Sequence, residues 1–160
     1  RDLDAGGATG SEAQRVTADE VNDHGEPIGA AGEPVDVVVF AAPQLSLVEM
    51  AQVAALCRGR RRADTTDMIV CTPVQVYGDA SQLGYIEAIE SFGGTVLTGT
   101  CFYQQYAREI AEANGWSRLL SNSAKIVNIL GGYGYRPALA SMEDCVASAE
   151  AGTVIDRRPA

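Results

Sequence analysis

The sequence is poor in the residues that most catalytic and metal sites use. His24 is its only histidine, and its four cysteines, Cys57, Cys71, Cys101 and Cys145, are far apart and form no C-x-x-C pair. This spacing excludes a zinc knuckle and a thioredoxin-like motif. A catalytic cysteine–histidine pair would have to recruit His24 from a polar turn, and we do not expect one.

Basic side chains are also scarce. The chain has 12 Lys and Arg against 21 Asp and Glu, a formal net charge of -9. Such a charge repels a phosphate backbone, so we expect no nucleic-acid partner. The one basic run, residues 58–62, follows a helical pattern and is typical of a solvated helix end.

Long apolar runs are missing as well. No stretch approaches the roughly 20 apolar residues of a membrane helix, and the first residues show no signal-peptide pattern. We therefore expect a cytoplasmic protein with no membrane partner, in which disulfides do not form. Cys57 and Cys145 lie inside helical patterns and Cys71 lies in a strand pattern, so all three are expected to be buried.

The sequence does contain a regular alternation of strand and helix patterns. We predict strands over residues 35–41, 68–71, 95–98, 119–120 and 136–140. Helices are predicted from Ser46 to about residue 58, over 80–92, 103–113 and 124–130, and from Ser141 onward. The alternation predicts an α/β fold, a three-layer α/β/α sandwich with a parallel sheet of repeated strand-helix units. Residues 1–34 are interpreted as a flexible leader or linker, 35–152 as the domain and 153–160 as a tail.

Capping patterns mark the helix ends. Ser46 and Glu49 have the spacing of a capping box, and Thr17 with Glu20 predicts a short helix in the leader. Asp79 is placed to cap the predicted helix 80–92, which Gly93-Gly94 would end, and Ser141 is placed to cap the last helix.

Ligands of an open parallel sheet bind beyond the carboxyl ends of the strands. The loops expected there, residues 41–46, 71–75, 98–101 and 121–125, are rich in hydroxyls and amides. For any one of these loops taken alone, plain helix capping is the favoured explanation. Residues 121–125 are the strongest candidate, because Lys125 adds a full positive charge to that edge.

Cys101 follows Gly99-Thr100 at a predicted strand end. A thiolate there would act as a nucleophile or a metal ligand. An iron-sulfur cluster is the better use of it, although one cysteine alone cannot hold a cluster.

Three segments of the chain resemble the aconitase X family, which includes large-subunit dehydratases acting on cis-3-hydroxy-L-proline and mevalonate 5-phosphate. They are Val39-Phe40-Ala41-Ala42-Pro43-Gln44-Leu45-Ser46, the stretch from Gly84-Tyr85-Ile86-Glu87-Ala88 to Thr98-Gly99-Thr100-Cys101, and Ser121-Asn122-Ser123-Ala124-Lys125 with Gly131-Gly132. The resemblance covers about residues 35–150. It implies an aconitase-like sub-domain, the last part of a large catalytic domain.

The resemblance also implies a function. Its members are hydro-lyases that dehydrate small hydroxy acids, using an iron-sulfur cluster held by three cysteines between a large domain and a small swivelling one. Cys101 would be one ligand of a 2Fe-2S or 4Fe-4S cluster, whose other ligands are expected outside this chain. Cys71 is a further candidate ligand by its place at a strand end, although we expect it to be a buried strand cysteine. Asn122, Ser123, Lys125 and Thr72 would bind the substrate.

One departure from the family concerns the first loop. Some relatives carry cysteine or histidine around Pro43, where this chain has Ala42 and Gln44, which leaves the cluster type and the substrate open. The fragment does not identify a catalytic base.

Two other functions stay open. The chain would serve as a non-catalytic α/β module that binds a small carboxylate, or as one subunit of a split dehydratase. A receiver domain is disfavoured because no acidic cluster follows the first strand, and a dinucleotide fold because no G-x-G-x-x-G is present. The dehydratase interpretation requires the Cys101 turn and the 121–125 turn to lie side by side at one edge of the sheet.

Overall fold

The computed structural model describes residues 30–156 and contains one five-stranded parallel sheet. The strand order is β3-β2-β1-β4-β5. The strands are β1 (Val37–Phe40), β2 (Asp67–Thr72), β3 (Thr95–Thr98), β4 (Arg118–Ser121) and β5 (Arg136–Leu139). All pairs are parallel, which confirms the predicted α/β class.

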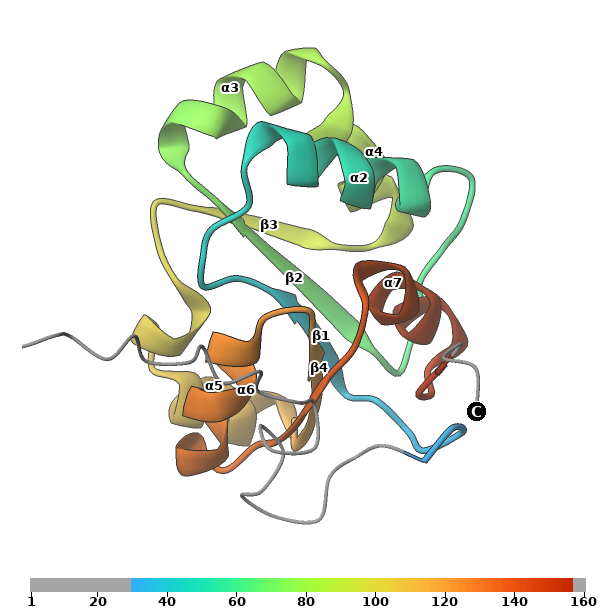
Figure 1. Ribbon diagram of the computed structural model, residues 1–160, viewed down its shortest axis with the longest axis vertical. Coiled ribbons are helices and arrows are strands. Elements are labelled where there is room, and N and C mark those ends of the chain that lie inside the picture. The colour runs from blue at the N-terminus through green and yellow to red at the C-terminus, as the bar shows by residue number, and fades with distance from the viewer. Residues whose placement is uncertain (1–29, 157–160) are drawn as a thin grey trace, which may run out of the picture.

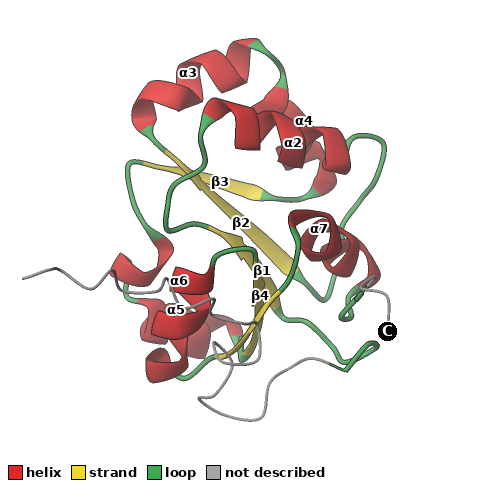
Figure 2. Ribbon diagram, viewed as in Figure 1, coloured by secondary structure: helices red, strands yellow, loops and turns green. Residues whose placement is uncertain are grey.

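Helices cover both faces of the sheet (Figures 1 and 2). They are α2 (Leu47–Cys57), α3 (Val74–Gln82), α4 (Tyr85–Phe92), α5 (Ala107–Asn114), α6 (Ala124–Leu130) and α7 (Met142–Ala151). Residues 30–156 also contain two short 3₁₀ helices, η1 (Phe102–Gln104) and η2 (Gly131–Tyr133).

The strand side chains alternate between two hydrophobic clusters, as the period of a strand requires. Val38 and Phe40 of β1 join a first cluster with α2, α4 and α7. Val37 and Val39 join a second cluster with α5 and α6. Because β1 is covered on both faces, its four residues are all buried and form the continuous apolar run seen in the sequence.

The strand order reverses between β1 and β4. From β1 the chain moves outward through β2 to β3, and then crosses to the other side of β1 to build β4 and β5. The loops that follow β1 and β4 therefore lead to helices on opposite faces, α2 on one and α6 on the other. A crevice at such a reversal is where open α/β sheets bind ligands.

Two helix predictions were wrong in extent. Residues 80–92 are not one helix: α3 begins after Pro73, and α4 follows Gly84, whose φ of 73° breaks the helical path. Asp79 lies inside α3 and caps nothing. The predicted helix 103–113 is divided into η1 and α5, because Tyr106 has a φ of 54°.

The other local predictions hold. Ser46 and Glu49 form the capping box, and the side chains of Ser123 and Ser141 accept backbone hydrogen bonds at the starts of α6 and α7. Cys57, Cys71 and Cys145 are buried. His24 and the predicted helix 17–21 lie outside the described residues.

The two ends of the described chain meet at the amino-terminal side of the sheet. Pro34 forms an antiparallel bridge with Thr153, and the Val35 N–H donates to the carbonyl of Gly152. No helix within residues 30–156 is long and apolar enough to cross a bilayer. The cytoplasmic location stays a prediction.

Candidate functional site

The carboxyl ends of the strands form what we call the rim, made of the loops at residues 41–46, 71–75, 98–106 and 121–125. Because all five strands are parallel, these loops meet at one edge of the sheet. Side-chain hydrogen bonds join neighbouring loops directly. The Thr72 hydroxyl donates to the Leu45 carbonyl at 2.9 Å, and the Gln44 amide nitrogen Nε2 donates to the Thr100 carbonyl at 2.6 Å.

The loops after β1 and β4 are held together at the strand reversal. The Ser123 hydroxyl donates to the carbonyl of Ala42 at 2.6 Å, and the Ser121 hydroxyl donates to the carbonyl of Val39 at 2.7 Å. The Ala42-Pro43 peptide is cis, and Ala42 is a buried alanine with a φ of 52°. The two loops therefore form one connected backbone surface at the predicted ligand crevice.

The segment after β3 crosses the sheet to reach this crevice. In Figure 1 it descends on the left from β3 toward α5 and α6. Phe102 anchors it: its side chain is 2% exposed, and its ring packs against Trp116 and Tyr135 at centroid distances of 6.5 and 6.1 Å. The Tyr135 hydroxyl in turn donates to the carbonyl of Ala107. Residues on either side of Phe102 are thereby fixed at the rim.

Those two neighbours, Cys101 and Tyr103, are half-buried and pack against the second hydrophobic cluster. The Nζ atom of Lys125, one residue into α6, lies 5.5 Å from the centre of the Tyr103 ring. This contact places the Cys101 turn beside the 121–125 turn, which is the adjacency that the sequence interpretation requires.

The five predicted site residues differ in what they present at the rim. Lys125 is exposed, and Asn122 and Cys101 are half-exposed. Ser123 is half-exposed, but its hydroxyl is already engaged with Ala42 and with the N–H of Ile126. Thr72 is fully buried and supports the first loop through Leu45. That these residues bind a substrate or a metal cluster is still a prediction.

Cys71 lies next to Cys101, but its thiol is unreactive. Burial, followed by the proximity of Cys101, raises the pKa of Cys71 to about 11, so its thiol is protonated at neutral pH. Within residues 30–156 no three side chains among His, Cys, Asp and Glu are grouped so as to hold a metal ion. The described residues therefore do not fit a complete iron-sulfur site, since such clusters are commonly held by several thiolates.

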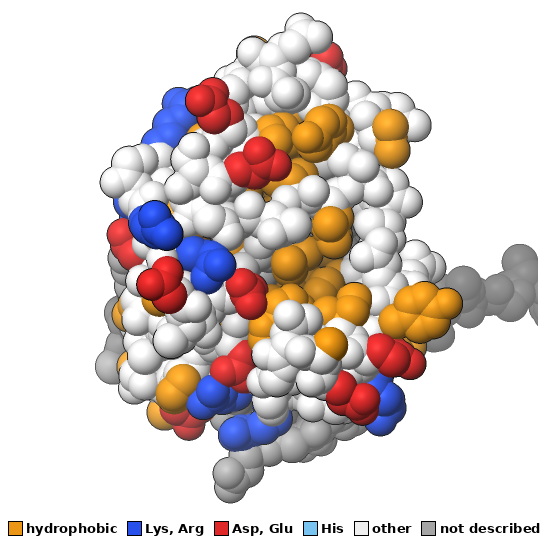
Figure 3. Space-filling view, turned by 180° about the vertical axis from the view of Figure 1, so that it is seen from behind, with side chains coloured by type: hydrophobic (Ala, Val, Ile, Leu, Met, Phe, Trp, Pro, Cys, Tyr) orange, Lys and Arg blue, Asp and Glu red, His pale blue; other side chains and the backbone are white. Residues whose placement is uncertain are grey.

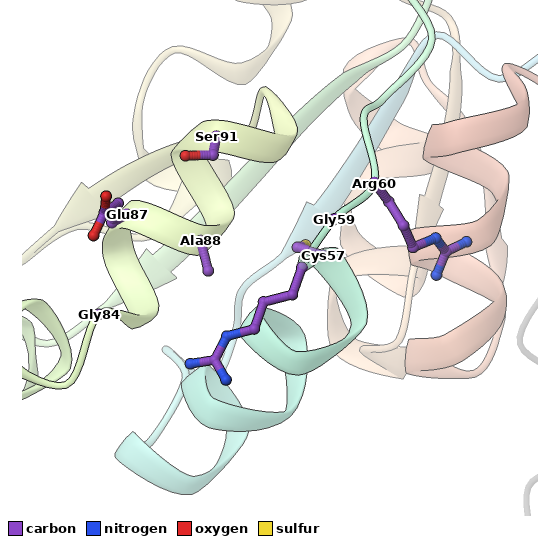
Figure 4. Close-up of a pocket in the computed structure, with 8 residues that line it drawn as sticks. Cys57, Gly59, Arg60, Gly84, Glu87, Ala88 and Ser91 are labelled. Atoms are coloured by element: carbon purple, nitrogen blue, oxygen red, sulfur yellow. The ribbon is translucent and has the colours of Figure 1, made fainter.

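A groove of about 380 Å³ lies elsewhere, between the end of α2 and α4 (Figure 4). It is lined by Cys57, Arg58, Gly59, Arg60, Gly84, Glu87, Ala88 and Ser91, and none of them belongs to the rim. Arg60 is ion-paired with Glu150, and burial raises the pKa of Cys57 to about 12. These two groups are thus unsuited to catalysis, and we place the candidate site at the rim.

Sequence reasoning missed two rim residues, Gln44 and Tyr103. Each acts across loops: Gln44 bonds to Thr100, 56 positions away, and Tyr103 contacts Lys125. No local pattern encodes such a contact. Only the path of the chain from β3 to β4 brings Tyr103 near Lys125.

Comparisons with known proteins support one family. The model of the aconitase X third domain matches residues 35–151. A cis-3-hydroxy-L-proline dehydratase of Pseudomonas aeruginosa is 31% identical over 149 residues, which are 92% of this chain and 25% of that protein. A phosphomevalonate dehydratase large subunit of Methanocaldococcus jannaschii is 26% identical over 69% of this chain and 26% of its own length.

The fold has a counterpart among solved structures. Thermococcus kodakaraensis aconitase X (holo-form) matches with a TM-score of 0.59 and 21% identity, over 72% of this chain and 29% of that one. The chain thus spans about a quarter of the length of the curated relatives it matches. Because the family model covers most of the described residues, the chain belongs to the aconitase X family and corresponds to its third domain.

Proposed function

We propose that this chain supplies part of the active site of a hydro-lyase that dehydrates a small hydroxy acid similar to cis-3-hydroxy-L-proline. The observation that supports it most is the meeting of three rim loops, where the Lys125 ammonium lies over the turn that carries Cys101. The named relatives, a cis-3-hydroxy-L-proline dehydratase and phosphomevalonate dehydratase large subunits, give the reaction class.

The substrate carboxylate would bind to Lys125 and Asn122. Lys125 is the single lysine of the chain and is exposed at the rim, so its ammonium is available to an anion. The half-exposed Asn122 amide offers two N–H donors in the same loop. Ser123 and Thr72 donate their hydroxyls to backbone carbonyls, so we expect them to contribute by fixing the shape of the binding loops.

Cys101 is the cysteine we propose as a ligand of an iron-sulfur cluster. Cys57, Cys71 and Cys145 are buried, whereas Cys101 is half-exposed at the rim. The described residues do not complete a cluster site, so the other ligands would come from sequence outside this chain. We assign no reaction step to the cluster here.

The partners of the chain would be the rest of a large aconitase X domain and a small swivelling domain or subunit. The edge strand β3 offers a surface for such packing, because Val96 and Leu97 are half-exposed and Thr95–Thr98 contains neither proline nor charge. Figure 3 shows hydrophobic side chains gathered along the middle of the side turned away in Figure 1. In a split dehydratase the same surface would bind a separate chain.

A second candidate is a module that binds a small carboxylate without chemistry. The observation in its favour is that the described residues hold no group of three metal-binding side chains. Such a module would use Lys125 and Asn122 in the same way and would not need Cys101.

The test is the cluster content of the protein, produced with its natural flanking sequence and partners and purified without oxygen. We expect brown protein that contains iron and sulfide, and the loss of both in Cys101→Ala. Cys57→Ala is the matched control and should keep them, because Cys57 is buried in the first hydrophobic cluster. Colourless protein that still binds a hydroxy acid would support the module, and equal cluster content in the two variants would refute the role of Cys101.

A further inference from the structure

The contact between Lys125 and Tyr103 joins two rim loops that are far apart in the sheet. β3, which precedes Tyr103, and β4, which precedes Lys125, are separated by β2 and β1. The ring of Tyr103 nevertheless lies 5.5 Å from the Lys125 ammonium, which is within the range of a cation–π interaction. No hydrogen bond or ion pair with another described residue holds Lys125.

Tyr103 is itself fixed in place by the core below it. Its neighbour Phe102 is buried among Trp116 and Tyr135, and the Gln104 N–H closes the turn by donating to the carbonyl of Cys101. A side chain on this turn has little freedom compared with the long and exposed side chain of Lys125. The ring therefore limits where the ammonium can go.

We propose that Tyr103 is a positioning residue, whose ring holds the Lys125 ammonium beside the Cys101 turn so that an anion bound by Lys125 lies next to Cys101. The proposal deepens the proposed function and rests on it, because it presumes that Lys125 binds the carboxylate of a hydroxy acid. Tyr103 need not touch the substrate for this role.

The contact can be observed without any activity. Because Lys125 is the single lysine, reductive methylation with ¹³C-formaldehyde labels only Lys125 and the amino terminus and keeps their charge. A ring current should shift the Lys125 methyl signal in the unsubstituted chain. We expect the shift to persist in Tyr103→Phe and to vanish in Tyr103→Leu. Tyr133→Leu, which removes an exposed tyrosine of η2 outside the rim loops, is the matched control and should leave the signal unchanged.

The consequence for binding is measured with lactate as the hydroxy-acid probe, by ligand-observed NMR on the unlabelled chain. Tyr103→Leu should weaken lactate binding about twofold to fivefold, as expected for loss of an exposed cation–π contact. Tyr103→Phe keeps the ring and should bind lactate like the unsubstituted chain. Lys125→Gln should abolish binding, and Tyr133→Leu should leave it unchanged.

The outcomes separate the two proposals. If Lys125→Gln weakens binding and Tyr103→Leu does not, Lys125 binds the anion and the positioning role of Tyr103 is wrong. A Lys125 methyl signal that is identical in Tyr103→Leu and the unsubstituted chain also overturns it. If Lys125→Gln binds lactate normally, or the unsubstituted chain binds none, the proposed substrate site fails and the positioning role fails with it.

Discussion

The two ends of the sheet are built with different chemistry. At the amino-terminal end, which we call the base, charged groups are tightly paired. The Asp36 carboxylate accepts hydrogen bonds from the backbone N–H groups of Ser117 and Arg118 and from the Arg118 guanidinium. Arg62 donates to three backbone carbonyls and pairs with Asp67, which also accepts from the Trp116 indole.

The rim has the opposite character. Its loops are joined by neutral side chains that donate to backbone carbonyls, and the exposed charge of Lys125 rests on an aromatic ring. Ala42 and Tyr106 have positive φ values of 52° and 54°, and both lie in rim loops. Residues held in this region cost free energy and persist where the surroundings fix them, often near functional sites. The base therefore stabilises the domain, which lets the rim carry backbone with positive φ values at Ala42 and Tyr106.

The largest expected effect comes from breaking the base. Asp36→Ala should lower the free energy of unfolding by about 2 to 3 kcal/mol, because it leaves two backbone N–H groups and a guanidinium without their acceptor. The measurement is chemical denaturation at neutral pH. The matched rim variant Gln44→Ala removes one neutral hydrogen bond and should cost about 1 kcal/mol or less. Equal losses in the two variants would contradict the division between base and rim.

The second largest effect is expected at acidic pH, where Asp36 becomes protonated. Burial tends to raise the pKa of Asp36, but the hydrogen bonds from Arg118 and Ser117 outweigh it and hold the pKa below the ordinary aspartate value of 3.8. The folded state therefore binds fewer protons than the unfolded state around that value, and its stability should fall as the pH drops through 3.8 toward the folded pKa.

Denaturation midpoints between neutral and strongly acidic pH test this expectation. The stability of Asp36→Ala should fall less steeply with pH in that range, since this variant lacks the titrating carboxyl group. If Asp36→Ala loses as much stability on acidification as the unsubstituted chain does, another carboxyl group controls acid unfolding.

The smallest expected effect is a gain at the rim. Tyr106 is 78% exposed, so its side chain contributes little burial, and its left-handed backbone is costly for any residue with a Cβ. Tyr106→Gly should raise the free energy of unfolding by up to about 1 kcal/mol. The measurement is thermal denaturation of Tyr106→Gly and of the control variant Tyr133→Gly. Tyr133 has no positive φ, so a glycine there relieves no strain. A loss of stability in Tyr106→Gly would show that the rim backbone is unstrained there.

Much of the fold could be predicted because its signals are local. The run Val37–Val39 identifies a doubly covered strand, and Ser46 and Ser141 identify helix starts through their own hydrogen bonds. The break at Gly84 was missed because a glycine inside an amphipathic pattern is compatible with a continuous helix. The positive φ of Ala42 was missed because alanine carries no sign of it.

The candidate site was only partly accessible to sequence reasoning. Lys125, Asn122 and Cys101 were identified because strand ends and residue types suffice to place them at the rim. Tyr103 and Gln44 matter through partners that only the crossing from β3 to β4 brings near. Thr72 carries a hydroxyl of the kind that binds ligands, but this hydroxyl is buried and donates to the Leu45 carbonyl. No spacing in the sequence distinguishes such a supporting hydroxyl from an exposed one.

The arrangement of the rim is tested most directly by whether the Cys101 turn and Lys125 lie together in solution. Cys101 is half-exposed and the other cysteines are buried, so a nitroxide can be attached to it selectively, and the ¹³C-methyl signal of Lys125 can be observed at the same time. We expect the nitroxide to broaden the Lys125 signal strongly. The same label on Ser91→Cys with Cys101→Ala, in the groove between α2 and α4, should leave it sharp. A Lys125 signal that stays sharp with the label on Cys101 would show that Lys125 and the Cys101 turn do not lie together.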